Sequence, residues 1–575
     1  MRDPRPRDTF LHAYGTAAPE RPWPPHHACA PPPPQRYLAT CHSHADIHTM
    51  AWGKPSTASP AATASELVAK ASATNSIVVL PFRTFADAEM TALCGLLAAA
   101  PAITAINSSG KALGAEGAAA LGALLSSGRC ALRKLAVGDA TFAESGGLRT
   151  LAGSVEASCP LHVLDLGYKG LDGARDGTSA LTPLLSRCAD LRDLTLSRNP
   201  ELGAAGVAAL VASGCLGASC TLTRVEVSES GLGGAAIAAL AAAATTGMRS
   251  LDTLLLARNP AIGADGPQGA TALGRLMASL PALRCIHLQE CALATAAAAA
   301  LASALGGAHM ALGEVRLCGN DGLFADAQGE GGGNVEALPA SFIESALPTR
   351  IEYEASLRLP HTERAAAERV ARASTHSATD RVTGSTTVGA NGGAGLALLA
   401  ALGACPRLST LSMGSCALTD HHASALRRAA RGRLAPAGGT NVVCVADLDV
   451  RSNRLSAAGA ADLLIVSGIE RLALFDNPPI GTSAAGSSTA LRAALGQTAC
   501  LHTLDLGACG LNTPTLKEVC TALCGGAAPL LRCLELFGNG QEDGDAWKAV
   551  LAELREERDE IDVAWKEPAG DAPSE

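Results

Sequence analysis

The chain has 575 residues, which is long enough for several ordinary domains or for one extended repeat array. Hydrophobic residues make up 48% of it but aromatic residues only 3%, so any core must be built from leucine, valine, isoleucine and alanine. The formal net charge of −9 lacks the basic excess that nucleic-acid binders carry, which argues against a dedicated nucleic-acid-binding protein.

Residues 1–60 are rich in proline, alanine and histidine and are expected to be disordered. Six histidines and cysteines lie between His26 and His44, but the prolines among them favour chance, so we expect no metal site and no cofactor. There is no apolar stretch typical of a secretory signal, and the 19 cysteines are scattered. We therefore expect a reduced, cytoplasmic protein, with nuclear or cytoskeletal association left open. The sequence does not decide between Met1 and Met50 as the first translated residue.

An eleven-residue template, L-x-x-L-x-L-x-x-N/C-x-L, recurs about every thirty residues between about residues 100 and 545. Clear copies are LRDLTLSRNPEL at 191–202, LDTLLLARNPAI at 251–262 and LHTLDLGACGL at 501–511. Each copy predicts a short strand, a turn and an alanine-rich helix. One repeat cannot bury its own leucines, so the copies must stack into a single array. The copies start at residues 103, 132, 161, 191, 222, 251, 283, 312, 408, 445, 469, 501 and 531.

The ninth template position carries asparagine or cysteine in most copies. We predict that this side chain turns inward and hydrogen-bonds loop backbone groups that have no partner in the sheet. The structural residues of the turn are then Asn199, Asn259, Cys291, Asn320, Cys416, Asn453, Asn477, Cys509 and Asn539.

The rhythm is interrupted after residue 320. Residues 321–333 are expected to form a long loop before the helix of their repeat, and the next strand is expected within 351–360. A low-complexity insertion over 360–393 would then precede a helix at 394–404. This divides the array into 76–359 and 394–545, and 546–575 is expected to form a last helix, a closing strand and a frayed tail. The alanine-rich segment 291–313 is in register with the helices of the repeats, so we interpret it as a repeat helix and not as a membrane span.

This pattern resembles the leucine-rich repeat proteins, specifically their long-repeat, ribonuclease-inhibitor-like type. The resemblance implies an α/β solenoid, a right-handed horseshoe with parallel strands on the concave face and helices on the convex face. The pattern is also similar to the Ran GTPase-activating proteins and to the repeat region of NOD-like receptors. No P-loop and no nucleophile–base spacing stands out from the repeat grid, so we expect no enzyme and no catalytic residue.

The template position between the second and third leucines should face the concave surface, and it is often acidic. A mildly acidic face of low relief favours a basic surface or segment of a protein partner, although acidic strand residues can also serve solubility alone. The candidate partner-binding residues of this column are Asp165, Glu226, His287, Arg316, Asp449, Asp505 and Glu535. Arg198 and Arg258 are further candidates on the turn that follows the strand.

Two functions remain open from the sequence. The first is a monomeric, non-catalytic protein–protein interaction scaffold, with an unidentified protein partner and with neither nucleic acid nor a membrane as partner. The alternative is a GTPase-activating protein for a Ran-like small GTPase, for which the resemblance implies turn residues at Arg198–Asn199 and Arg258–Asn259. The array is longer than the compact horseshoe of that family, carries an insertion and lacks a long acidic tail, which favours the scaffold.

Overall fold

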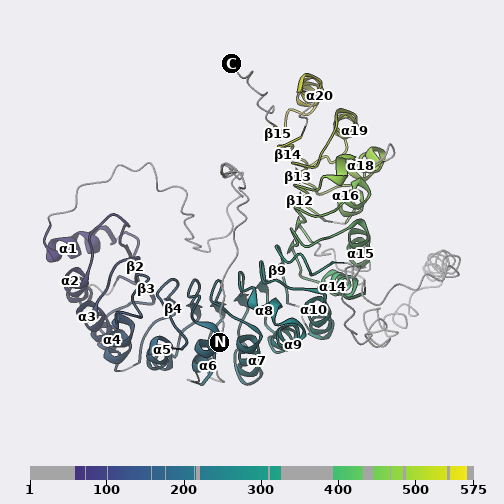
Figure 1. The fold of residues 1–575 in the computed structure, drawn as a ribbon. Helices are drawn as coiled ribbons and strands as arrows, with labels where there is room; N and C mark the ends of the chain where they lie inside the picture. The colour runs from purple at the N-terminus through teal and green to yellow at the C-terminus, as the bar shows by residue number, and fades with distance from the viewer. Residues whose placement is uncertain are drawn as a thin grey trace, which may run out of the picture. The chain divides into compact units, whose positions relative to one another are not determined.

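The repeats form one continuous parallel sheet of 15 strands in which the spatial order equals the order along the chain. The computed structural model describes residues 58–71, 73–99, 102–156, 158–174, 176–212, 214, 216, 221–308, 311–325, 393–431, 445–466, 468–482, 487–539 and 544–565. Figure 1 shows the strands along one side of the array and the helices along the other. This is the α/β solenoid architecture that the repeat predicts.

The strands are β1 (Ser76–Val78), β2 (Ala105–Ser109), β3 (Lys134–Gly138), β4 (Val163–Asp165), β5 (Asp193–Thr195), β6 (Arg224–Glu226), β7 (Thr253–Leu255), β8 (Cys285–His287), β9 (Glu314–Arg316), β10 (Thr410–Ser412), β11 (Asp447–Asp449), β12 (Arg471–Ala473), β13 (Thr503–Asp505), β14 (Cys533–Glu535) and β15 (Asp562–Ala564).

The helices are α1 (Pro60–Ala71), α2 (Asp87–Leu97), α3 (Ala115–Ser126), α4 (Gly147–Ser154), α5 (Asp176–Arg187), α6 (Gly203–Ala212), α7 (Gly234–Thr246), α8 (Ala261–Ala264), α9 (Gly266–Ala278), α10 (Thr295–Ala308), α14 (Gly393–Ala404), α15 (Asp420–Arg431), α16 (Ala457–Leu464), α17 (Pro479–Thr482), α18 (Ser487–Leu495), α19 (Thr513–Cys524) and α20 (Gly544–Glu557).

In neighbouring strands, residues at the same template position lie opposite each other, so the strands pair without stagger. The second leucine of one copy lies opposite the second leucine of the next, as in the series Leu194, Val225 and Leu254. These side chains are almost fully buried and point toward the helices. A fully buried leucine contributes roughly 2 kcal/mol of transfer free energy. Because the same template position recurs on each strand, this apolar row is continuous along the sheet.

The turn after each strand is held by buried hydrogen bonds between consecutive repeats. Asn259 is fully buried, and its Oδ1 accepts the backbone N–H groups of Ser230 at 3.0 Å and Leu232 at 3.1 Å, both in the preceding repeat. Its Nδ2 donates to the carbonyls of Val227 at 2.9 Å and Leu256 at 2.8 Å. One amide group therefore satisfies loop groups that the sheet leaves unpaired, and it ties two repeats together.

At the ninth template position, asparagine largely alternates along the array with serine, cysteine or lysine, which act there as hydrogen-bond donors. Cys291 occupies it in the repeat after Asn259, and its Sγ donates to the Leu256 carbonyl at 3.2 Å. Ser230 donates from Oγ to the Leu196 carbonyl at 3.1 Å in the same way. Lys111 and Lys169 also occupy the position. Lys169 is only 1% exposed and donates from Nζ to Ser109 Oγ at 2.7 Å.

The sheet passes directly from β9 to β10, because Val315 lies opposite Leu411. No strand stands between these two, which corrects the expectation of a further repeat with a strand within 351–360. That segment and residues 360–392 of the expected insertion lie outside the described residues, whereas Gly393 is the first residue of α14. The helix at 393–404, α14, packs between α10 and α15 and so serves the repeat of β9.

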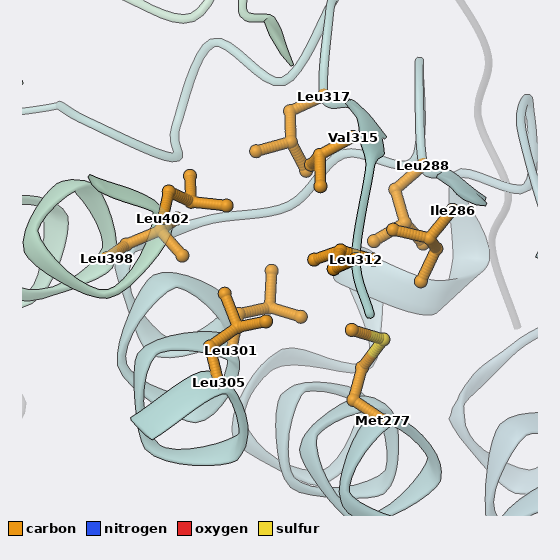
Figure 2. Close-up of a pocket in the computed structure, with 10 residues that line it drawn as sticks. All are labelled: Met277, Ile286, Leu288, Leu301, Leu305, Leu312, Val315, Leu317, Leu398 and Leu402. Carbon is orange, nitrogen blue, oxygen red and sulfur yellow. The ribbon is translucent and has the colours of Figure 1, made fainter. Parts of the chain in front are cut away.

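A small void marks the place where α14 joins the array (Figure 2). Its lining is entirely apolar and includes Leu305 of α10, Leu312 before β9 and Leu398 of α14. The cavity measures about 10 Å³. That volume is near the limit for one water molecule, and an apolar wall offers water no hydrogen bond. We interpret the void as a packing gap and not as a ligand site.

We expect Asn259→Ala to destabilise the array by roughly 3 kcal/mol, because it leaves several buried loop groups without partners. Asn259→Cys should lose less, because the thiol can donate to the Val227 carbonyl of the preceding repeat, as Cys291 donates to the Leu256 carbonyl. Urea denaturation monitored by circular dichroism measures both losses. An equal loss in the two variants would contradict the role assigned to this amide.

Candidate binding surface on the exposed face of the sheet

Two columns of side chains point away from the helices, and together with the residues just after the strands they form what we call the exposed strand face. The sequence identified the column at the fifth template position but missed the column at the third. Strand side chains alternate between faces, so positions three and five share one face. The third-position residues are Lys134, Val163, Asp193, Arg224, Thr253, Cys285, Glu314, Thr410, Asp447, Arg471, Thr503 and Cys533.

The middle of the exposed strand face is paired internally. Arg224 Nη2 lies 2.9 Å from Glu226 Oε2. His287 Nε2 and Arg316 Nε lie 2.9 Å and 2.6 Å from the same oxygen, Glu314 Oε1. Both carboxylate oxygens of Asp449 accept hydrogen bonds from Arg451, at 2.9 Å and 2.8 Å. Four of the candidate residues are therefore paired within the chain itself: Glu226, His287, Arg316 and Asp449.

Asp165 lies near the N-terminal part of this face. Burial raises the pKa of Asp165, and the negative charge of Glu226 acts in the same direction. Its Oδ1 accepts the N–H of Gly167 at 2.9 Å, and the ammonium of Lys169 favours the ionised form. A buried cation and a backbone donor thus hold this carboxylate within its own repeat.

Asp505 and Glu535 lie opposite each other on β13 and β14. None of the ion pairs within the described part of the chain involves either residue. Burial raises the pKa of Asp505 to about 6, and the carboxylates of Glu535 and Asp449 add to this. The N–H of Gly507 and the charge of Arg451 oppose this rise in pKa but do not cancel it. Two adjacent carboxylates without an ion pair are energetically unfavourable when both are ionised, and an incoming positive charge would relieve that cost.

Two phenylalanines flank these carboxylates. Phe475 and Phe537 follow β12 and β14 at equivalent positions, and Phe537 remains 43% exposed. Gly507 lies between them, two residues after the end of β13, where a Cβ atom would come within 2.7 Å of Cδ2 of Phe475. The glycine therefore leaves the space into which one ring extends. We call Asp505, Glu535, Phe475 and Phe537 the acid–aromatic patch.

The eighth template position, directly before the turn residue, forms what we call the rim, and it carries alternating charges on four successive repeats: Arg198, Glu229, Arg258 and Glu290. Arg258 is 54% exposed, yet its guanidinium contacts Glu229 at 3.0 Å and Glu290 at 3.2 Å. Arg198 makes a longer contact of 3.8 Å with Glu229. The structure thus brings the two candidate rim arginines into one chain of ion pairs.

The backbone of this rim position is left-handed in repeat after repeat. Arg198 has φ of 60° and Arg258 has φ of 58°, a region that non-glycine residues rarely adopt. The conformation is supported because each N–H donates to the next repeat, from Arg198 to the Ser228 carbonyl at 2.8 Å and from Arg258 to that of Gln289 at 2.7 Å. The turn, and not the side chain, determines where these arginines lie.

The described cysteines are free thiols. Within the described residues no helix is both long and apolar enough to cross a bilayer. At the start of α15, His422 is only 3% exposed and packs edge-on against Phe324, with ring centroids 5.4 Å apart.

The repeated strand, asparagine turn and helix define the leucine-rich repeat fold. No protein-family model matches the sequence, and no curated protein matches it significantly. Among solved structures, an internalin from Listeria monocytogenes is similar at 13% identity with a TM-score of 0.36, over 88% of this chain and 93% of that one.

Two further solved structures are similar at the same level. LegL7, a leucine-rich repeat-containing protein from Legionella pneumophila, is 14% identical with a TM-score of 0.33, over 71% of this chain and 93% of that one. A chain of the yeast Rad7 and Elc1 complex is 12% identical with a TM-score of 0.36, over 84% and 85% of the two chains.

We expect Asp505→Asn to stabilise the protein at pH 8 by about 1–2 kcal/mol. The folded-state pKa of Asp505, about 6, lies above that of an unfolded aspartate, so the neutral form is favoured on folding and this contribution is lost as pH rises through 6. Below about pH 4 the gain should vanish, because Asp505 is then protonated in both states. Urea denaturation across pH 4–8 checks this, and Asp449→Asn, which removes a paired carboxylate, should show no such gain.

Proposed function

We propose that the chain is a non-catalytic scaffold that binds a basic segment of a partner protein on the acid–aromatic patch. The observation that supports this most directly is the adjacency of Asp505 and Glu535, two carboxylates with no ion pair among the described residues, beside an exposed phenylalanine. The full helix in most repeats supports a ribonuclease-inhibitor-like subtype as part of the same proposal.

Charge and surface chemistry favour a lysine- or arginine-containing segment. Burial, and to a smaller extent repulsion from Glu535, raises the pKa of Asp505, and a cation placed between the two carboxylates would offset both effects. The guanidinium or ammonium group can also stack on an aromatic ring, and arginine does so most readily. Phe537 is exposed on the same stretch of the sheet as these carboxylates. An acidic or purely apolar segment would gain neither interaction.

The rest of the exposed strand face suits this assignment less well. Its carboxylates at Glu226, Glu314 and Asp449 already pair with arginines of the chain itself. A partner would have to displace these internal partners, and exposed pairs of this kind exchange with little net gain. The acid–aromatic patch is therefore the favoured place on this face for a basic ligand.

We expect arginine-rich peptides to bind the full chain more tightly than peptides of the same length with the charges reversed. Fluorescence anisotropy at low and high salt measures this, and affinity should fall as salt rises because surface charges are screened. The double variant Asp505→Asn/Glu535→Gln and the single variant Phe537→Ala should each weaken binding at least roughly fivefold, about 1 kcal/mol.

The matched control is Glu553→Gln, which neutralises an exposed carboxylate on α20, on the helix side of the array. It should leave the peptide affinity unchanged. Equal weakening by Glu553→Gln, or unchanged binding in the double variant, would point to a non-specific effect of net charge and would remove the patch from the proposal.

The alternative, activation of a Ran-like GTPase, rests on the rim arginines. Arg258 is engaged by two glutamates, so it would have to leave both ion pairs to reach a nucleotide. Single-turnover GTP hydrolysis by a Ran-like GTPase separates the two functions. We expect no acceleration by the chain; acceleration that is lost in Arg198→Ala and Arg258→Ala would favour the activator instead.

A further inference from the structure

Three side chains with metal-binding atoms meet on the exposed strand face. Cys285 and His287 lie two residues apart on β8, so both point away from the buried Ile286. Glu314 lies on β9 directly opposite Cys285. The strand alternation and the unstaggered pairing together bring these residues to one spot, although 27 positions separate His287 from Glu314.

The donor atoms of this cluster are close enough to share one ion. One ligand atom from each of Cys285, His287 and Glu314 lies within 4.8 Å of the other two. His287 Nε2 is 2.9 Å from Glu314 Oε1. No other group of three such residues converges in this way in the portion of the chain that the structure describes. All three side chains are half-buried, so the cluster is sheltered yet open to solvent on one side.

The electrostatics favour a cation over nucleophilic chemistry at this spot. The pKa of Glu314 is lowered to about 2, chiefly by its hydrogen bond with His287, so this carboxylate is ionised at neutral pH. Burial raises the pKa of Cys285 to about 12, and the negative charge of Glu314 contributes. A thiol that holds its proton so firmly is a poor nucleophile, but coordination to a metal ion deprotonates it.

We propose that Cys285, His287 and Glu314 bind a Zn²⁺ ion through Sγ, Nε2 and a carboxylate oxygen. Sulfur and imidazole nitrogen favour zinc over magnesium or calcium, which prefer oxygen ligands only. On binding, Cys285 releases its proton to solvent and one Zn–S bond forms. A water molecule completes the four-coordinate ion on the open side, in the manner of zinc sites with three protein ligands.

Arg316 competes with the metal for the same carboxylate. Its Nε donates to Glu314 Oε1 at 2.6 Å, and its side chain is 44% exposed. Zinc must displace this guanidinium, which can move into solvent. Removing Arg316 should therefore strengthen metal binding, whereas removing any of the three ligands should weaken it.

The test uses the full chain in a Cys29→Ser/Cys41→Ser background. These two cysteines lie near histidines in the N-terminal segment, so removing their thiols keeps that segment from contributing sulfur ligands. Isothermal titration with Zn²⁺ and absorption spectroscopy with Co²⁺ report affinity and thiolate ligation. We expect one equivalent of metal and a sulfur-to-cobalt charge-transfer band. Cys285→Ser, His287→Asn and Glu314→Gln should each weaken Zn²⁺ at least roughly tenfold, and Arg316→Ala should bind more tightly.

Cys533→Ser is the matched control. Cys533 occupies the same template position on β14 and lies near Glu535, but no histidine completes a cluster there among the described residues. Its substitution should leave the cobalt spectrum unchanged. Absence of one-equivalent binding, or a charge-transfer band that persists in Cys285→Ser with unchanged circular dichroism, would overturn the proposal.

Discussion

The structure depends on the satisfaction of backbone groups at the turn between each strand and the following helix. The inner side of this turn is buried, so the N–H and carbonyl groups there have no access to water and need hydrogen-bond partners within the array. Asn259 shows the solution, because one amide group accepts two N–H groups and donates to carbonyls of its own repeat and of the preceding one. Each turn can therefore form only when its neighbour is in place, which makes the array cooperative.

That constraint also creates the surface on which both proposed sites lie. Because consecutive turns are tied at the same template position, consecutive strands pair without stagger, and the side chains of the sheet fall into straight columns. Residues about thirty positions apart in sequence then become neighbours. Asp505 meets Glu535 in this way, and Cys285 meets Glu314. The acid–aromatic patch and the cysteine–histidine–glutamate cluster are both products of one register.

The two proposed sites differ in how their charges are balanced. At Glu314 the carboxylate is shared by His287 and Arg316, so a metal ion must compete with an existing cation. Asp505 makes no ion pair among the described residues, and burial together with the charge of Glu535 raises its pKa although Arg451 acts in the opposite direction. The first arrangement favours a small ion that forms strong bonds to sulfur and nitrogen. The second favours a large, soft cation such as a guanidinium group, supported by the neighbouring rings.

The sequence by itself determined the fold class and the strand positions, because leucine spacing and turn residues are local signals that repeat with one period. It also identified the fifth-position column, including Asp449, Asp505 and Glu535. Only the tertiary structure decided which of these carboxylates are paired, and it added Cys285 and Glu314 from the overlooked third position. It also showed that β9 pairs directly with β10, so α14 completes the repeat of β9 across the break in the pattern. Which side chains contact each other across strands depends on the register between repeats and on how far each side chain reaches. The residue spacing within a single repeat specifies neither.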